Sequence, residues 1–67
     1  MTNIYVRNLA PPISETRLRS EFEAYGRVDR VYVCWDFAVI GMDDEMAAKS
    51  AISDLNRRTT WFLREYS

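Results

Sequence analysis

Apolar and polar residues alternate with a period of two along several stretches of the chain, and this period is typical of β-strands. In residues 3–9, Ile4 and Val6 fall on one side and Tyr5 on the other. Residues 28–34 repeat the alternation, with two valines on one side. Both stretches are rich in β-branched and aromatic residues, which favour strands. We therefore predict strands at residues 3–9 and 28–34.

The stretch at residues 35–42 differs because it is apolar on both sides. Ala38, Ile40 and Met42 would face one way, and Trp35, Phe37, Val39 and Gly41 the other. Such strands are usually covered on both faces, but a chain of 67 residues is too short to cover both easily. We therefore expect one face of the sheet to carry uncovered aromatic rings that bind a partner. The strand itself is predicted at about residues 37–42, so only Trp35 and Asp36, or one residue more, are left for a tight turn before it.

Two other segments repeat apolar residues at helical spacing. Leu18, Phe22 and Tyr25 recur at i, i+4 and i+7 after Ser14, a favoured N-cap residue. Gly26 follows at once and is expected to end this helix. The spacing thus predicts a helix that starts after Ser14.

A second helix is predicted after the acidic capping segment 43–45. Its apolar positions are Ala48, Ala51, Ile52 and Leu55. Residues 56–60 are expected to form a polar loop, and residues 61–66 a last strand. If Tyr66 faces inward, the alternation also places Arg64 inward, which is costly for an unpaired charge. A register that buries Leu63 instead is expected to need a bulge or a bend.

The resulting order is strand, helix, strand, strand, helix, strand. This order predicts a ferredoxin-like βαββαβ α+β sandwich, with a four-stranded antiparallel sheet and both helices on one face. We expect a single domain over residues 1–67, without internal repeats or linkers.

The composition excludes several classes of function. The chain has no histidine and one cysteine, so we expect no disulfide, no metal site and no cofactor. It lacks a glycine-rich phosphate loop and a nucleophile beside a base, so an enzyme is not expected. No run approaches the roughly 18 apolar residues of a membrane span, and no secretory signal is expected. The net charge of −1 means that locally clustered arginines must carry any binding of nucleic acid.

Two segments resemble the short motifs of the RNA recognition motif family. Residues 4–9, Ile-Tyr-Val-Arg-Asn-Leu, match the family's hexamer at every position. Residues 35–42 are similar to its octamer only in part. Phe37, Ala38 and Ile40 match, whereas Trp35, Asp36, Val39 and Met42 replace a basic residue, a glycine and two aromatic residues. The two helical patterns are also similar to those of the family, so the resemblance covers nearly the whole chain. The short turn at 35–36 is similar to that of members with trimmed loops, some of them in splicing-related proteins.

The resemblance implies binding of single-stranded RNA, whose unstacked bases lie on aromatic rings of the sheet. Tyr5 matches the hexamer's stacking position and Phe37 the octamer's first stacking position. Val39 stands where a further ring is usual, and the loss of one stack removes about 1–3 kcal/mol of binding free energy. We therefore expect modest affinity for RNA.

Further candidates follow from their positions, each with an alternative explanation. Tyr32 shares the face of Tyr5, although tyrosine is common in strands. Arg7 can pair with a phosphate or stack on a base, or it can be merely solvated. Trp35 either adds a stacking ring or covers apolar surface at the hairpin. The complete set of predicted RNA-binding residues is Tyr5, Arg7, Tyr32, Trp35, Phe37, Val39, Arg57 and Arg58, the last two as phosphate contacts from a loop.

A module that binds a protein remains an alternative on the same fold. The acidic balance favours it, and Trp61 and Phe62 are candidates for its contact surface. Self-association through the open sheet or an unpaired strand edge is a third interpretation. Our first expectation is one RNA-binding module of a larger RNA-processing or splicing-related protein. The resemblance also implies an intracellular location, in the nucleus rather than the cytoplasm.

Overall fold

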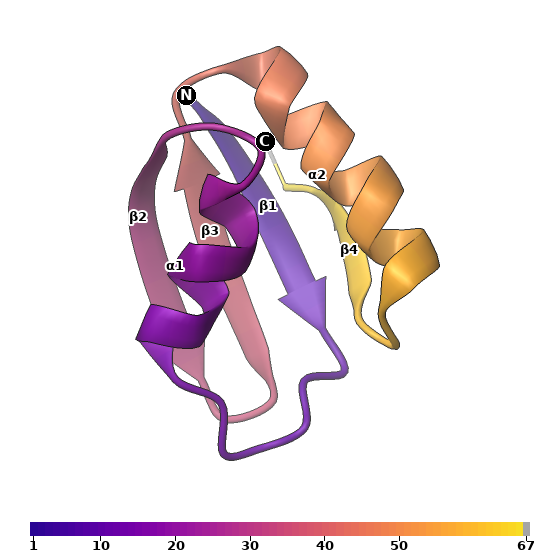
Figure 1. Ribbon diagram of the computed structural model, residues 1–67. Helices are drawn as coiled ribbons and strands as arrows, with labels where there is room; N and C mark the ends of the chain where they lie inside the picture. Colours follow the sequence, from indigo (N-terminus) through magenta and orange to yellow (C-terminus); the bar gives the residue numbers. More distant parts are fainter. Residues whose placement is uncertain (67) are drawn as a thin grey trace.

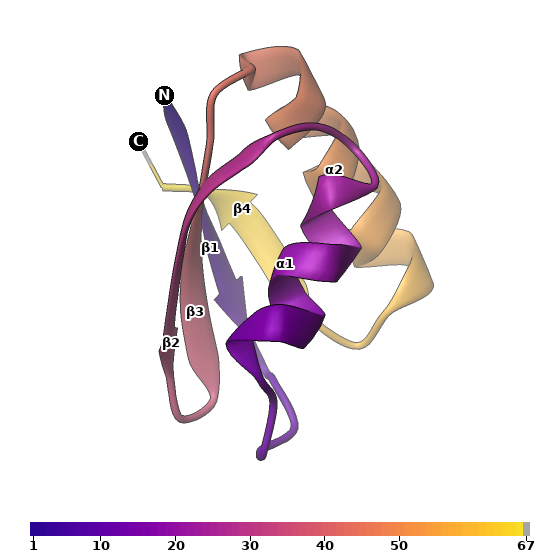
Figure 2. The same cartoon turned by 60° about the vertical axis from the view of Figure 1, so that its left-hand side comes forward.

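Residues 1–66 are described by a computed structural model of the chain. Six elements follow one another: β1 (Thr2–Arg7), α1 (Glu15–Glu23), β2 (Val28–Cys34), β3 (Phe37–Met42), α2 (Glu45–Arg58) and β4 (Phe62–Glu65). The strands form one antiparallel sheet in the order β2-β3-β1-β4 (Figure 1). Both helices cover the same face of this sheet, and the other face is bare (Figure 2). The predicted ferredoxin-like βαββαβ architecture is therefore confirmed.

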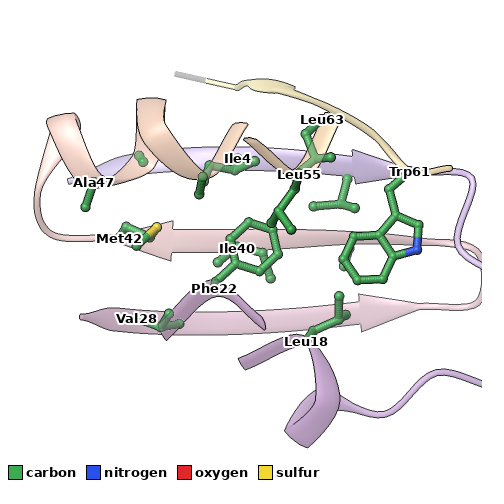
Figure 3. Packing of buried hydrophobic residues seen from close by; sticks show 14 of the residues in the cluster. Ile4, Leu18, Phe22, Val28, Ile40, Met42, Ala47, Leu55, Trp61 and Leu63 are labelled. Carbon is green, nitrogen blue, oxygen red and sulfur yellow. The ribbon is translucent and has the colours of Figure 1, made fainter. Parts of the chain in front are cut away.

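The core lies between the sheet and the two helices. Ile4, Val6, Ala38 and Ile40 are fully buried on the inner face of β1 and β3, as their alternation predicts. Apolar residues of the helices meet them, among them Leu18, Phe22 and Leu55 (Figure 3). Full burial of such a side chain contributes about 1.5–3 kcal/mol each, so this layer is the main source of stability.

Helix α1 begins as predicted but does not end at Gly26. The Ser14 hydroxyl accepts a hydrogen bond from the Arg17 backbone N–H at 3.0 Å, and the helix is capped at Ala24. Gly26 does not have the positive φ of a glycine stop, so that prediction is wrong. Its role is close approach instead, because a Cβ there would lie 2.7 Å from the Cβ of Ala47 in α2.

Helix α2 is longer than predicted, and the loop expected at residues 56–60 is wrong for its first three positions. Arg57 and Arg58 close the helix, and both pair with Asp54 one turn earlier, at 2.9 and 3.2 Å. Positive charge in the last turn also stabilises the helix, because it interacts favourably with the negative end of the helix dipole. Asn56 exchanges two hydrogen bonds of 2.9 Å with the backbone of Leu63, so the end of α2 is fastened to β4.

Strand β4 pairs with β1 in a regular register. Val6 lies opposite Leu63 and Tyr5 opposite Arg64, without a shift. Leu63 is therefore buried and Arg64 is exposed, so neither an inward Arg64 nor a bulge is present here. The expectation failed because it assumed an inward Tyr66. Tyr66 faces outward, so Arg64, two positions earlier, faces outward as well.

The one irregularity of the sheet lies in β2, where the register against β3 shifts between Val28 and Arg30. The hairpin that follows is as short as predicted: Cys34 pairs with Phe37, and Trp35 and Asp36 alone form the turn. Trp35 has a φ of 54°, a left-handed conformation that a bulky side chain rarely adopts.

Candidate nucleic-acid interface

The bare face of the sheet is built from the outward residues of all four strands, which we call the open face. These residues are Asn3, Tyr5, Arg7, Arg30, Tyr32, Cys34, Phe37, Val39, Gly41, Phe62 and Arg64, with Tyr66 directly after β4. They form rows across the sheet. The central row runs from Tyr32 through Val39 and Tyr5 to Arg64, each residue opposite the next. Strand pairing thus brings together residues that are far apart in the sequence.

Tyr5 and Phe37 lie side by side on this face. Their ring centroids are 5.6 Å apart and the ring planes are tilted by 58°. Both side chains are half-buried, so neither ring is enclosed by the protein's interior. On its other side the Tyr5 ring is 6.1 Å from the ring of Tyr66. The two rings on which the RNA-binding prediction depends are therefore neighbours on a common surface.

The other predicted contacts of the sheet also lie on or beside this face. Tyr32 is exposed on β2, and Val39 separates it from Tyr5 in the central row. Arg7 is exposed on β1 and pairs with Phe62 of β4. Val39 is half-buried, so the position of the missing ring holds a small apolar surface between two tyrosines.

Trp35 does not cover apolar surface, because its side chain is 77% exposed. That alternative is wrong. Its left-handed backbone is a conformation for which turns favour glycine or asparagine. Neither local conformation nor packing accounts for a tryptophan here, and its role as a stacking ring stays a prediction.

The charges of the chain are divided between its two sides. Six of the side-chain cations, Arg17, Arg19, Arg27, Lys49, Arg57 and Arg58, pair with carboxylates of the helices and their connections. Arg7, Arg30 and Arg64 have no ion pair within 4.0 Å among residues 1–66. All three belong to the open face, and none of the residues that define this face carries a carboxylate; Asp36 lies at its edge, in the β2–β3 turn. The net charge of −1 therefore hides a basic face opposite an acidic helical layer.

Arg57 and Arg58 are not part of this basic face. They end α2, on the covered side of the sheet, and both donate to Asp54. The Tyr25 hydroxyl donates to the same carboxylate and in turn accepts from Arg58. The hydrogen bond from Tyr25 is the main reason why the pKa of Asp54 is lowered, and the same bond raises the pKa of Tyr25. This cluster joins the segment after α1 to the end of α2.

The predicted protein-binding surface of Trp61 and Phe62 does not exist as one surface. The two side chains are neighbours in an extended segment and point to opposite faces. Trp61 is 7% exposed and closes one end of the core beside Leu18 and Leu55 (Figure 3). Phe62 is 64% exposed and stands on the open face. The prediction failed because two adjacent aromatic residues at the start of a strand do not reveal which of them faces the core.

Four residues of the open face were not among the predicted RNA contacts: Arg30, Phe62, Arg64 and Tyr66. Phe62 and Tyr66 add two exposed rings on the β4 side, where the resemblance supplied no motif. The sequence carried no signal for them, because the outward residues of the last strand are fixed by the burial of Leu63 and Trp61, which only the structure shows.

Asn8 has a structural role, as its turn-forming residue type suggests. Its φ of 65° is left-handed, a conformation that asparagine tolerates better than most residues. The side-chain amide donates to the Thr60 backbone carbonyl at 2.9 Å. This bond ties the end of β1 to the loop that precedes β4.

A family model described as the RNA recognition motif matches residues 4–62. The chain belongs to the RNA recognition motif family. Membership agrees with the expectation from the residue inventory that this RNA recognition motif domain is not an enzyme. Within residues 1–66 no three metal-ligating side chains lie together, and the helices are too short and too polar to cross a bilayer.

Curated relatives are splicing factors and a nuclear ribonucleoprotein. The chain is 41% identical over 64 residues to serine/arginine-rich splicing factor RSZ21 of Arabidopsis thaliana. The aligned region covers 91% of this chain and 34% of that protein. It is 34% identical over 53 residues to heterogeneous nuclear ribonucleoprotein Q of Rattus norvegicus. This aligned region covers 79% of this chain and 10% of the relative. The chain therefore spans about a third or less of the length of these relatives.

Solved structures share the fold over nearly the whole chain. The crystal structure of RNA Binding Protein PG1 superposes with a TM-score of 0.92 at 27% identity and covers 98% of this chain and 94% of that one. The RRM domain of S. pombe Puf1 superposes with a TM-score of 0.91 at 20% identity, covering 98% and 89%, respectively. The second similarity shows the fold alone.

Proposed function

We propose that this RNA recognition motif binds single-stranded RNA on its open face, with bases stacked on Tyr5 and Phe37. The observation that carries the proposal is the adjacency of these two rings, 5.6 Å apart on a face that neither helix covers. Stacking on an aromatic ring contributes about 1–3 kcal/mol per base and tolerates any base. Two neighbouring rings therefore bind two successive bases without demanding one sequence.

The charges on this face support RNA as its ligand. Arg7, Arg30 and Arg64 surround the aromatic rows and are not neutralised by carboxylates of the described chain. Phosphates that follow the stacked bases would meet these guanidinium groups, which bind phosphate through two parallel hydrogen bonds. Tyr32, Trp35, Phe62 and Tyr66 extend the stacking surface toward both edges.

The missing ring at Val39 keeps the affinity of the single domain modest. A small aliphatic side chain covers a base poorly compared with an aromatic ring. The additional rings on the β4 side compensate for the missing ring at Val39 only if the RNA crosses that side of the sheet. We propose that the domain acts as one module of a larger RNA-processing protein in the nucleus, which agrees with the names of the splicing factor and the heterogeneous nuclear ribonucleoprotein that it resembles.

The proposal is tested by titrating the chain with a pool of random single-stranded RNA hexamers at low salt. Tyr5→Leu and Phe37→Leu keep apolar volume but remove the ring. Each should weaken binding by about 1–3 kcal/mol, or roughly 5- to 150-fold in Kd. Kd is measured by fluorescence anisotropy, and the thermal unfolding of each variant is followed to verify the fold.

The matched control is Met46→Leu, because Met46 is also an exposed apolar side chain but lies on the helical layer. Its Kd should equal that of the unchanged chain. NMR titration identifies the face directly. If RNA shifts the resonances of α2 and leaves Tyr5 and Phe37 unmoved, or shifts none at all, the proposed face is wrong.

A further inference from the structure

A hollow of about 230 Å³ lies at one end of the open face, where the β2–β3 turn meets the entry to β4. Its walls are Tyr5, Arg7, Asn8, Asp36, Phe37 and Phe62. Phe37 belongs to β3 and Phe62 to β4, the two neighbours of β1, so the hollow is flanked by a ring on either side. Pockets for drug-sized ligands usually measure about 300–1,000 Å³, so this one suits a smaller planar group.

The walls of the hollow are held in place by two hydrogen bonds from the segment after β1. The Leu9 backbone N–H donates to the Asp36 carbonyl at 3.0 Å, which fixes the hairpin turn. The Asn8 amide donates to the Thr60 carbonyl at 2.9 Å, which fixes the loop before Phe62. Both aromatic walls are thus positioned before any ligand binds, and such preorganisation lowers the cost of binding.

Asp36 is unusual among the six lining residues because it carries the only carboxylate. No hydrogen bond or ion pair of its side chain occurs within residues 1–66, and Arg7 of the same hollow is likewise without an ion pair. An ionised carboxylate accepts hydrogen bonds and cannot donate them. It repels phosphate, so in a hollow of an RNA-binding face its favourable partners are the N–H groups of a base.

We propose that this hollow is a base-binding subsite and that Asp36 makes it selective for guanine in single-stranded RNA. The inference rests on the proposed RNA-binding function. Guanine alone presents two adjacent donors, N1–H and the 2-amino group, on its Watson–Crick edge, and a carboxylate accepts from both at once. Cytosine, adenine and uracil place an acceptor beside each donor, which a carboxylate repels. The rings of Phe37 and Phe62 flank the base, and Arg7 lies within reach of its phosphate.

Four RNA hexamer pools test the subsite, each made from three of the four nucleotides. The pool that lacks guanine should bind the chain about tenfold more weakly than the pools that lack adenine, cytosine or uracil. In Asp36→Asn the four pools should bind with equal Kd. Asp43→Asn is the charge-matched control, because Asp43 follows β3 at its other end and pairs with Arg27; it should keep the preference for guanine.

A second measurement compares each guanine-containing pool with the same pool made with inosine in place of guanosine. Inosine lacks the 2-amino group, so the chain should bind it about fivefold more weakly, whereas Asp36→Asn should bind both alike. The proposal is overturned if the unchanged chain binds all four pools equally, which leaves RNA binding itself intact. A guanine preference that persists in Asp36→Asn also overturns it, because the selecting group is then elsewhere. If no pool binds, the proposed function and the subsite fail together.

Discussion

Single side chains of this domain decide where polar groups find partners. Tyr25, Asp54 and Arg58 form one hydrogen-bonded cluster, although Tyr25 lies before β2 and the other two lie in α2. The Tyr25 hydroxyl stabilises the ionised form of Asp54, which lowers the pKa of that carboxyl. The same carboxylate stabilises the protonated form of Tyr25 and raises the pKa of its hydroxyl. Both shifts favour the folded state at neutral pH.

The cluster predicts an acid-sensitive part of the stability. A carboxyl whose pKa is lower in the folded chain contributes its full stabilisation above its unfolded pKa of about 4. That contribution is lost as the pH falls through the lower folded pKa. The melting temperature of Asp54→Asn, measured by circular dichroism from pH 6 to pH 2, should therefore fall less steeply than that of the unchanged chain.

Asp29→Asn is the control for this measurement, since Asp29 is exposed and has no ion pair within residues 1–66. Its acid profile should follow that of the unchanged chain more closely than Asp54→Asn does. Parallel profiles for the unchanged chain and Asp54→Asn would show that the cluster contributes nothing to folding.

Among the elements, β4 contributes alternate residues to the core and to the candidate RNA-binding face. Its alternation sends Trp61 and Leu63 into the core and leaves Phe62 and Arg64 on the open face. Asn56 of α2 holds this phase by bonding both backbone groups of Leu63. One short strand of four residues therefore serves both the core and the candidate RNA surface.

Two neighbouring substitutions separate these roles. Trp61→Ala removes a large buried ring and should lower the free energy of unfolding by about 3–5 kcal/mol. Phe62→Ala removes an exposed ring and should change the free energy of unfolding by less than about 0.5 kcal/mol, while weakening RNA binding by about 1–3 kcal/mol. Urea denaturation and anisotropy titrations measure the two quantities. A Phe62→Ala variant that is as unstable as Trp61→Ala would contradict the outward placement of Phe62.

At the scale of the whole molecule, the division of charge explains how a chain of net charge −1 can bind a polyanion. The cations of the helical layer are paired locally, whereas Arg7, Arg30 and Arg64 gather on the bare side of the sheet. Total charge governs solubility, but counterion release depends on the cations that meet phosphate.

This division predicts the salt dependence of RNA binding. If the three open-face arginines each neutralise one phosphate, log K should fall with log salt at a slope of about −2, since single strands give about −0.7 per contact. Arg64→Gln should reduce the slope to about −1.4. Arg27→Gln should leave it unchanged, because Arg27 pairs with Asp43 beyond the far end of β3. A slope near zero would contradict the basic face and favour an apolar peptide as ligand.

The sequence by itself determined the order of elements, the bounds of β2, the inward residues of β1 and β3, and the start of α1. Each of these follows from local periodicity or a capping residue, which act over a few positions. The choice of Tyr5 and Phe37 came from a resemblance, and the ring distance of 5.6 Å shows that the two side chains are neighbours.

Only the tertiary structure decided the end of α2, the phase of β4 and the membership of the basic face. The end of α2 is held by contacts with other elements: Asn56 bonds both backbone groups of Leu63 in β4, and the Tyr25 hydroxyl donates to Asp54. Trp61 enters the core because Leu63 is in register with Val6, a partner 57 positions earlier in the chain. Such contacts depend on which strands become neighbours, so no local pattern could reveal that Phe62, Arg64 and Tyr66 share a face with Tyr5.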